Sequence, residues 1–376
     1  MSIPPTPEAA ALEARARRYH RRKRLLALAD FLLGVGVLSG LLFTGWTHDL
    51  RNWAVGITPG APGALGLYLL ALAGITQALS FPLDLASGHR LEHRFGLSRQ
   101  QFFGWLKDWL KAFAVSFALG LAAAELIYFA LRRFPATWWL LSAAAFVLFF
   151  ILLARLAPVL LLPLFFKFEP LADDELRERL QRLSKRVGTR VRGVWLWKLG
   201  EKSRKANAAL VGWGKTRRIV LADTLLEKHQ PEEVEVILAH ELAHHVHNDL
   251  WKGIAVQSVL ALAGFYAVHR ALAAWTAPLG FTGIADFANL PLLLLIAAGI
   301  SLVALPAANA YSRHLEREAD LFALRTTGNR EAFIRSMEKL AEQNLAQRRP
   351  HPWIEFIFYS HPSVEKRVGL AQSWQA

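Results

Sequence analysis

The chain has 376 residues, of which 53% are hydrophobic, and its mean hydropathy of +0.25 is too high for an ordinary soluble enzyme. It contains no cysteine, so disulfides, thiol catalysis and thiolate metal ligands are excluded. The net charge of +14 does not indicate a nucleic-acid partner, because the basic residues flank apolar stretches, as membrane topology requires. We therefore expect a membrane protein with a soluble portion.

The N-terminal residues 1–24 are basic, with seven Lys and Arg, and the apolar run 25–46 follows them. A secretory signal peptide is the alternative interpretation. Its apolar core would be shorter, however, and no small-x-small cleavage site follows Trp46. We expect a basic cytoplasmic tail at 1–24 and a signal anchor after it.

Five further apolar stretches are long enough to cross roughly 30 Å of hydrocarbon. They lie near 63–86, 111–131, 137–160, 251–275 and 290–308. The predicted organisation is a four-span region at 25–160 and a two-span region at 251–308, with soluble segments at 161–250 and 309–376.

The distribution of Lys and Arg predicts the orientation of these six spans. The loop 87–110 carries Arg90, Arg94, Arg99 and Lys107, whereas the loops on the opposite side carry only Arg51, Arg132 and Arg133. Because basic loops stay in the cytoplasm, both termini and the insertion 161–250 are expected there. Asp30, Asp84 and Arg155 fall within apolar runs and are expected to face the bundle interior or water, since a charge facing lipid is costly; snorkelling to the interface is the alternative.

The insertion 161–250 has the pattern of a small α+β unit. Acidic residues at 173–175 open a helix that ends near Gly188, and 191–198 alternates as a strand. Residues 206–211 and 218–221 flank 212–216, which is typical of a hairpin connection.

The same insertion ends in the motif H-E-x-x-H at 240–244. On a helix, His240 and His244 share one face and can bind one zinc ion at roughly 2.0–2.1 Å. Glu241 points about 100° away from that face, where it can take a proton from water activated by zinc. Chance spacing is the alternative, but Pro231 and two glutamates form a good helix start just before the motif. This helix is expected to run on towards the fifth span, so the zinc would lie near the membrane surface.

A catalytic zinc needs a third protein ligand and one open position. After the sixth span, Glu316 and Asp320 are four residues apart on a predicted helix. Glu316 can ligate the metal, and Asp320 can accept the remaining N–H of a ligating histidine. Glu318 is the alternative ligand, which helical geometry alone does not exclude.

Several motifs together carry a resemblance to a known family. They are H-E-L-A-H at 240–244, S-R-H-L-E-R-E-A-D at 312–320, N-A-A-L-V-G at 207–212, R-I-V-L-A-D-T-L-L at 218–226, S-H-P-S-V-E-K-R at 360–367, L-E-H-R-F-G-L-S at 91–98 and P-L-F-F-K-F at 163–168. From roughly residue 60 to its end, the chain resembles the type I CAAX prenyl endopeptidases, which are zinc-dependent integral-membrane proteases. It is more distantly similar to the HtpX-type membrane proteases.

The predicted fold is a mainly α, polytopic helical membrane protein of about six spans, whereas the eukaryotic members of the family have seven. Together with the α+β pattern of the insertion, the resemblance implies a cytoplasmic α+β zincin-like metalloprotease domain. It implies one zinc ion held by His240, His244 and Glu316, and His361 and Arg367 facing the substrate or the tetrahedral intermediate. It also implies an edge strand that pairs with extended substrate, formed by Asn207, Ala208, Ala209, Leu210, Val211 and Gly212; an ordinary hairpin is the alternative.

Three positions depart from the pattern of the eukaryotic members, so a prenylated C-terminus is not assumed as the substrate. Ala243 and His245 stand where Gly and Trp are usual, and Phe166 replaces a usual Asn. We therefore expect peptides or membrane proteins as substrates, a surrounding membrane lipid, no nucleic acid and no obligatory protein partner.

Two alternative hypotheses for the function are an inactive relative that acts as a binding scaffold and a metal transporter. The intact Glu241 disfavours the first, and ligands outside the spans disfavour the second.

Overall fold

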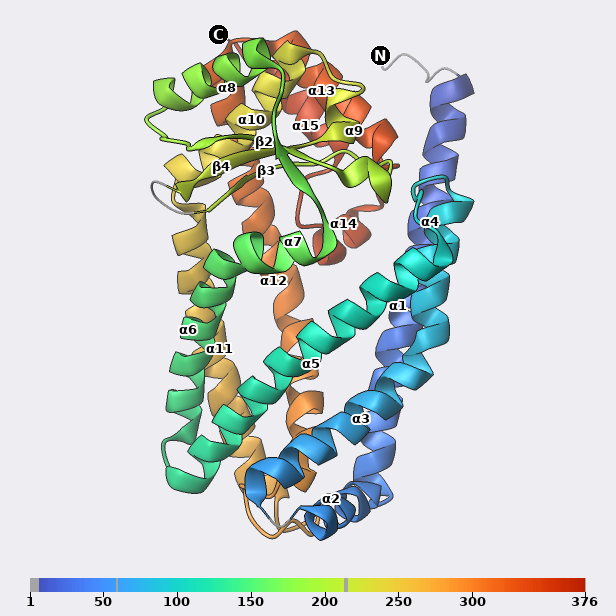
Figure 1. Cartoon of the computed structure of the whole chain (residues 1–376), viewed down its shortest axis with the longest axis vertical. Helices are drawn as coiled ribbons and strands as arrows, with labels where there is room; N and C mark the ends of the chain where they lie inside the picture. Colours follow the sequence, from blue (N-terminus) through green and yellow to red (C-terminus); the bar gives the residue numbers. More distant parts are fainter. Residues whose placement is uncertain (1–6, 59, 213–215, 376) are drawn as a thin grey trace.

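The computed structural model describes residues 7–58, 60–212 and 216–375 and has two parts (Figure 1). Six helical segments among these residues are long and apolar enough to cross a membrane, which confirms the predicted number of spans. They are Pro7–Phe43, Ala61–Arg94, Phe102–Arg133, Trp138–Phe165, Asp249–Trp275 and Phe287–Thr327. A domain with a small sheet lies at one end of the bundle, and the first described residues and the last helix lie at that same end.

The membrane part is built in chain order from helices joined by short connections. They are α1 (Pro7–Phe43), α2 (Trp46–Ile57), α3 (Ala61–Asp84), α4 (Leu91–Arg94), α5 (Phe102–Arg133), α6 (Trp138–Leu156), α7 (Leu162–Phe165), α11 (Asp249–Trp275) and α12 (Leu290–Thr327). Wider π-helical turns join α3 to α4 and α6 to α7, at Leu85–Arg90 and Ala157–Leu161. Two helices are longer than the predicted spans. α1 also includes most of the basic tail before residue 25, and α12 continues past residue 308 to Thr327.

The soluble part contains a four-stranded sheet and the remaining helices. The strands are β1 (Phe168–Pro170), β2 (Gly193–Trp197), β3 (Ala208–Val211) and β4 (Arg218–Ala222), in the order β1-β2-β4-β3. The helices are α8 (Asp174–Arg186), α9 (Asp223–Leu226), α10 (Pro231–Val246), α13 (Arg330–Gln343), α14 (Pro352–Phe358) and α15 (Val364–Ser373). β2 and β4 are parallel, whereas β1 and β3 pair antiparallel with their neighbours, so β3 lies at an edge. Residues 213–215 of the predicted connection lie outside the described residues.

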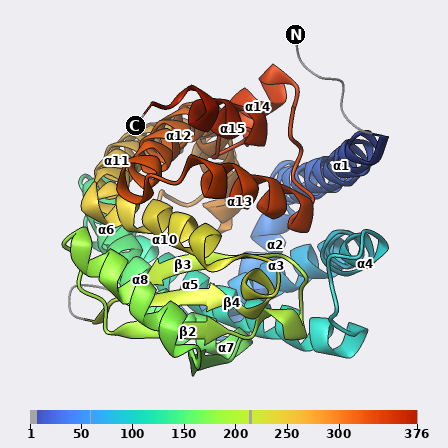
Figure 2. The same ribbon diagram turned by 90° about the horizontal axis from the view of Figure 1, so that it is seen from above.

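Local sequence signals explain where the helices of this domain begin. Asp173 caps α8 by accepting a hydrogen bond from the N–H of Leu176 at 2.9 Å, as the acidic run at 173–175 predicts. Gln230 and Glu233 form a capping box at the start of α10, with Pro231 in the first helical position. The buried face of α10 then joins residues of α8, the sheet, α12 and α13 in one hydrophobic core. Figure 2 shows α10 passing between the sheet and the C-terminal helices.

The prediction that the histidine helix runs on into the fifth span is wrong. α10 ends at Val246, and Asn248 has φ 56 and ψ 36, in the left-handed region, before α11 begins at Asp249. Asparagine adopts this conformation more readily than most residues, because its short side chain can hydrogen-bond locally. The chain therefore turns between the two helices, and Asp249 can point back towards α10.

The contact between α10 and α12 holds the domain to the membrane part. Each helix contributes two alanines four residues apart, Ala239 and Ala243 on α10 and Ala319 and Ala323 on α12, and all four are fully buried. Because the distance between two packed helices depends on the side chains at their contact, such small residues permit a close approach.

One predicted interior charge has clear partners within the bundle. Asp84, at the end of α3, accepts hydrogen bonds from Nε2 of Gln77 at 2.7 Å and from Nε1 of Trp109 on α5 at 3.0 Å. The carboxylate of Asp84 thus faces a neighbouring helix, and its hydrogen bonds offset part of the cost of burying a charge.

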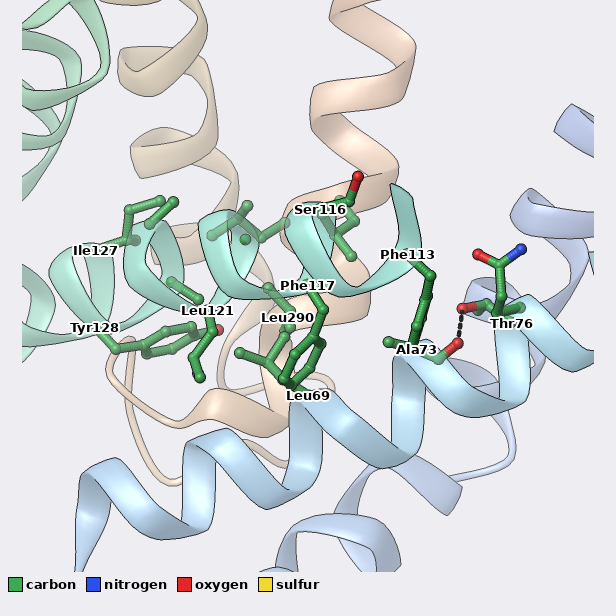
Figure 3. Close-up of a pocket in the computed structure, with 16 residues that line it drawn as sticks. Leu69, Ala73, Thr76, Phe113, Ser116, Phe117, Leu121, Ile127, Tyr128 and Leu290 are labelled. Carbon is green, nitrogen blue, oxygen red and sulfur yellow. Dashed lines mark hydrogen bonds between the residues drawn. The ribbon is translucent and has the colours of Figure 1, made fainter. Parts of the chain in front are cut away.

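A cavity of about 440 Å³ lies among α3, α5 and the start of α12 (Figure 3). Its wall is mainly apolar and includes Leu69, Phe113, Phe117 and Leu290, whereas Thr76 bonds the backbone of its own helix. None of the predicted site residues lines this cavity. The cavity is therefore a separate feature of the membrane part.

Replacing Ala319 with Leu should destabilise the domain, because it adds an isopropyl group at a fully buried position of α12. Overpacking of this kind costs about 1–3 kcal/mol, so the thermal midpoint of the purified protein should fall. Ala308→Leu adds the same group at an exposed position of the same helix and serves as the control. Equal midpoints for the two variants would contradict the tight contact.

Candidate metal centre and active site

Two histidines and one glutamate converge where α10 meets α12. Nε2 of His240 lies 3.2 Å from Oε2 of Glu316, and Nε2 of His244 lies 3.5 Å from Oε1 of the same carboxylate. One potential ligand atom from each of the three residues lies within 4.8 Å of the others. The structure thus brings the three predicted metal ligands together, although they come from segments that are over 70 residues apart.

The chemistry of this group fits a metal ion. Oε2 of Glu316 is buried and makes no hydrogen bond with any described residue, although it faces the imidazole of His240. Two imidazole nitrogens and one carboxylate oxygen are a ligand set typical of catalytic zinc sites with an open fourth position. Glu318, the alternative ligand, is not part of the group, and its Oε1 pairs instead with Nη1 of Arg317 at 3.3 Å.

Asp320 lies directly behind His240. Its Oδ1 is 2.9 Å from Nδ1 of His240, and the carboxylate is fully buried. Arg367 on α15 holds the same carboxylate through Nε at 2.8 Å and Nη2 at 2.5 Å. An imidazole that donates Nδ1–H to Asp320 keeps Nε2 free to bind a metal. Nη2 of Arg367 also lies 3.4 Å from Nδ1 of His240, so Arg367 contacts both Asp320 and this histidine.

His244 has an equivalent partner that the sequence analysis did not identify. Oδ2 of Asp249 lies 3.0 Å from Nδ1 of His244, and Asp249 is itself held by Nζ of Lys252 at 3.0 Å. The left-handed turn at Asn248 brings the first residue of α11 back to this position. The acidic residue five positions after His244 was visible in the sequence, but it lies on the same face only because the helix is broken.

The pKa values reflect this environment. Burial lowers the pKa of His240, but the carboxylates of Asp320 and Glu316 outweigh burial and raise it to about 9. A metal that binds at Nε2 therefore has to displace a proton. The pKa of Glu241 is raised, because the effect of burial outweighs the opposite effect of the neighbouring His240 and His244. A carboxylate with a raised pKa is a better proton acceptor near neutral pH.

His361 approaches the group from the loop before α15. Its Nε2 lies 3.3 Å from Oε1 of Glu316, and Ser360 Oγ lies 2.9 Å from its Nδ1. The side chain is 58% exposed, so it borders the open side of the group. The pKa of His361 is lowered, because partial desolvation of the ring and the nearby Arg367 together outweigh the opposite effect of Glu316.

The other two histidines of the motif region do not join the metal group. Nε2 of His245 lies 3.4 Å from the carbonyl oxygen of Leu210, so His245 connects α10 to the edge strand β3. His247 packs edge-on against Phe322 of α12, with ring centroids 5.4 Å apart. Both residues contact neighbouring elements of the domain instead of the metal group.

Comparison with known families assigns both parts of the chain. A family model described as peptidase family M48 matches residues 170–375. A second model, described as CAAX prenyl protease N-terminal with five membrane helices, matches residues 9–167. The metal group and β3 lie within the first of these matches.

Individual proteins are similar over most of the chain. The uncharacterized metalloprotease YhfN of Bacillus subtilis is 30% identical over 361 residues, which cover 95% of this chain and 84% of that protein. A CAAX prenyl protease 1 homolog of Arabidopsis thaliana is 30% identical over 312 residues, covering 79% and 71%. The crystal structure of S. mikatae Ste24p has the same fold, with a TM-score of 0.86 at 21% identity, over 99% of this chain and 92% of that one.

Replacing Glu316 with Ala should abolish stable metal binding, because only two nitrogen ligands would remain. Glu318→Ala removes the alternative ligand from the same helix and should leave the metal content unchanged. Elemental analysis of both purified variants measures the difference directly. Full occupancy in Glu316→Ala, together with loss in Glu318→Ala, would reverse the assignment.

Proposed function

The chain belongs to peptidase family M48, and we propose that it hydrolyses peptide bonds of membrane-associated peptides or proteins with one zinc ion held by His240, His244 and Glu316. The observation that carries this proposal is the convergence of these three side chains beside Glu241, at the end of a membrane bundle. Asp320 and Asp249 orient the two imidazoles. The ligand set and its carboxylate partners are those of a catalytic rather than a purely structural zinc site.

Each remaining side chain has a defined task in hydrolysis. A zinc ion at this position supplies Lewis acidity, which makes water more acidic and polarises the scissile carbonyl. Glu241 accepts the proton of the attacking water and later delivers it to the leaving amine. Its raised pKa suits both steps. His361, on the open side of the group, donates a hydrogen bond to the oxyanion of the tetrahedral intermediate.

Arg367 acts on the metal group mainly through Asp320. It holds both oxygens of Asp320, which in turn contacts His240. A paired carboxylate stays ionised and keeps the histidine in the tautomer that leaves Nε2 free. We assign Arg367 to positioning of the metal group, and contact with substrate is not needed for that task.

The register of β3 determines which of its backbone groups face away from β4. The N–H of Ala222 donates to the carbonyl of Asn207 at 3.0 Å, and these residues lie opposite each other in the ladder that pairs Ala208 with Leu221. Hydrogen-bonded and non-hydrogen-bonded pairs alternate in an antiparallel ladder, so Ala209 bonds β4. Ala208 and Leu210 therefore direct their N–H and C=O groups away from β4, towards the free edge.

This edge suits an extended peptide of varied sequence. Strand addition uses backbone hydrogen bonds, which any sequence can make. The contact between His245 of α10 and Leu210 holds the edge next to the metal group. We propose that residues 207–212 bind the substrate in this way. Both outward groups of Ala208 and the N–H of Leu210 make the hydrogen bonds, because the carbonyl of Leu210 already contacts His245.

The similar proteins named CAAX prenyl proteases suggest a membrane-anchored substrate, and the position of the site is compatible with one. Glu316 lies on α12, which runs from the bundle into the domain (Figure 1). Ala243, His245 and Phe166 differ from the usual residues of the eukaryotic proteins, so we do not extend the proposal to a prenyl group. The excess of Lys and Arg in the loop 87–110 and in the N-terminal segment supports a cytoplasmic location for both termini and the site.

Replacing Glu241 with Gln should retain the metal and abolish cleavage, because the base is lost while all three ligands remain. Loss of a general base slows catalysis roughly 10²–10⁴-fold. Metal content and peptide turnover are measured on the same sample. Turnover equal to that of the wild type would exclude this role for Glu241, and a wild type that cleaves no peptide would favour the scaffold hypothesis.

Proline substitutions separate the two sides of β3. Ala208→Pro removes an outward N–H and should lower kcat/KM about tenfold through KM, with little change in stability, because proline is tolerated at edge positions that do not bond the neighbouring strand. Ala209→Pro removes an N–H that bonds β4 and should lower the thermal midpoint instead. Unchanged kinetics in a folded Ala208→Pro protein would contradict substrate pairing at this edge.

A further inference from the structure

We propose that Asn344 closes one end of the free edge of β3 and thereby limits how far a bound peptide can extend. This inference rests on the proposed function, because it concerns the same edge strand. Asn344 directly follows α13 and lies outside the metal group. It is a specificity-determining residue in this proposal, and it takes no part in the chemical step.

The side chain of Asn344 makes the hydrogen bonds that a neighbouring peptide strand would make. Its Oδ1 accepts from the N–H of Ala206 at 2.9 Å, and its Nδ2 donates to the carbonyl of Ala206 at 3.2 Å. A side-chain amide has the same donor and acceptor groups as a peptide bond. Both backbone groups of Ala206 are therefore occupied.

Ala206 is the next outward-facing residue before Ala208. Because the carbonyl of Asn207 faces β4, the alternation along the strand directs the groups of Ala206, Ala208 and Leu210 to the same free edge. A peptide that pairs with Ala208 and Leu210 and continues in line would meet the amide of Asn344 at Ala206. The free edge available to a peptide thus ends at this position.

Asn344 is held firmly from its own side. The next residue, Leu345, has φ 51 and is 3% exposed, and it packs in a cluster with Tyr19 of α1 and Leu91 of α4. The preceding residue, Gln343, donates from Nε2 to the carbonyl of Thr224 at 2.6 Å. The residues on both sides of Asn344 are therefore fixed, and its side chain stays next to Ala206.

The segment that Asn344 pairs with is also fixed. Lys205 forms an ion pair with Glu92 of α4, with Nζ 2.8 Å from Oε2, and Tyr19 donates to the other oxygen of Glu92 at 2.5 Å. Thr224 donates from Oγ1 to the carbonyl of Lys205 at 2.6 Å. Both partners of the closed end are thus anchored to the part of α1 and α4 that extends beyond the bundle.

The test uses peptides that share one cleaved sequence and are lengthened by single alanines at either terminus. The starting peptide is one that the full-length, metal-loaded wild type cleaves, chosen from a defined synthetic mixture. With the wild type, kcat/KM should fall about tenfold at a defined length at one terminus, a loss comparable to one backbone hydrogen bond. In Asn344→Ala, the peptide length at which kcat/KM falls should increase by at least one residue at that terminus. The dependence of kcat/KM on length at the other terminus should not change.

Two further variants complete the design. Asn344→Ser is too short to reach both groups of Ala206 and should behave like Asn344→Ala, which guards against poor folding of one variant. Asn329→Ala is the matched control, because it removes an asparagine that caps the other end of α13 and should keep the wild-type length profile. Mass spectrometry of the products verifies that the cleaved bond stays the same.

The outcomes separate this inference from the proposed function. A wild type that cleaves peptides with no length limit at either terminus, or a limit that persists in folded Asn344→Ala and Asn344→Ser, would overturn the role of Asn344 alone. Absence of all cleavage by the metal-loaded wild type would overturn the proposed function and this inference with it. A length limit that moves outward in both Asn344→Ala and Asn344→Ser, and keeps its wild-type position in Asn329→Ala, would support the role of Asn344.

Discussion

The close contact between α10 and α12 is the constraint on which the candidate site depends. Fully buried alanines at 239 and 243 on α10, and at 319 and 323 on α12, permit the two helices to approach. His240 and His244 directly follow Ala239 and Ala243, and Glu316 lies three residues before Ala319. The same packing that joins the domain to the membrane part therefore brings His240 and His244 to Glu316. A larger side chain at the contact would separate the ligands as well as the helices.

The membrane part contributes more than an anchor to this metalloendopeptidase. α12 is one continuous helix that leaves the bundle and carries Glu316 and Asp320 into the domain. α11 begins with Asp249, which contacts His244. α1 and α4 hold Lys205, just before β3. Three separate connections to the membrane helices thus determine where the metal group and the edge strand lie relative to each other.

Much of this arrangement could be predicted from the sequence, because it follows from periodicity and spacing. The six apolar stretches predicted the six spans, the acidic run at 173–175 predicted the start of α8, and the four-residue spacings placed His240 with His244 and Glu316 with Asp320. The resemblance to a protease family supplied what spacing could not, including His361 and the edge strand. Arg367 came from the same source, but it contacts Asp320 in the structure.

The parts that the sequence analysis missed depend on backbone geometry between elements. The left-handed residue Asn248 breaks a helix that the apolar pattern continues, and only this break brings Asp249 to His244. Ala208 directs its backbone groups to the free edge and Ala209 directs its groups to β4. This difference can be assigned only from the observed register of the two strands. The pairing of Asn344 with Ala206 joins residues 138 positions apart and leaves no local pattern.

The central claim is that one metal ion is bound where α10 meets α12, and anomalous X-ray scattering at the zinc edge tests it most directly. A crystal of the purified wild type should show one anomalous peak per chain, at roughly 2.0–2.1 Å from Nε2 of both His240 and His244 and a similar distance from a carboxylate oxygen of Glu316. A peak at another group of residues, or no peak in a protein that cleaves peptides, would contradict the account.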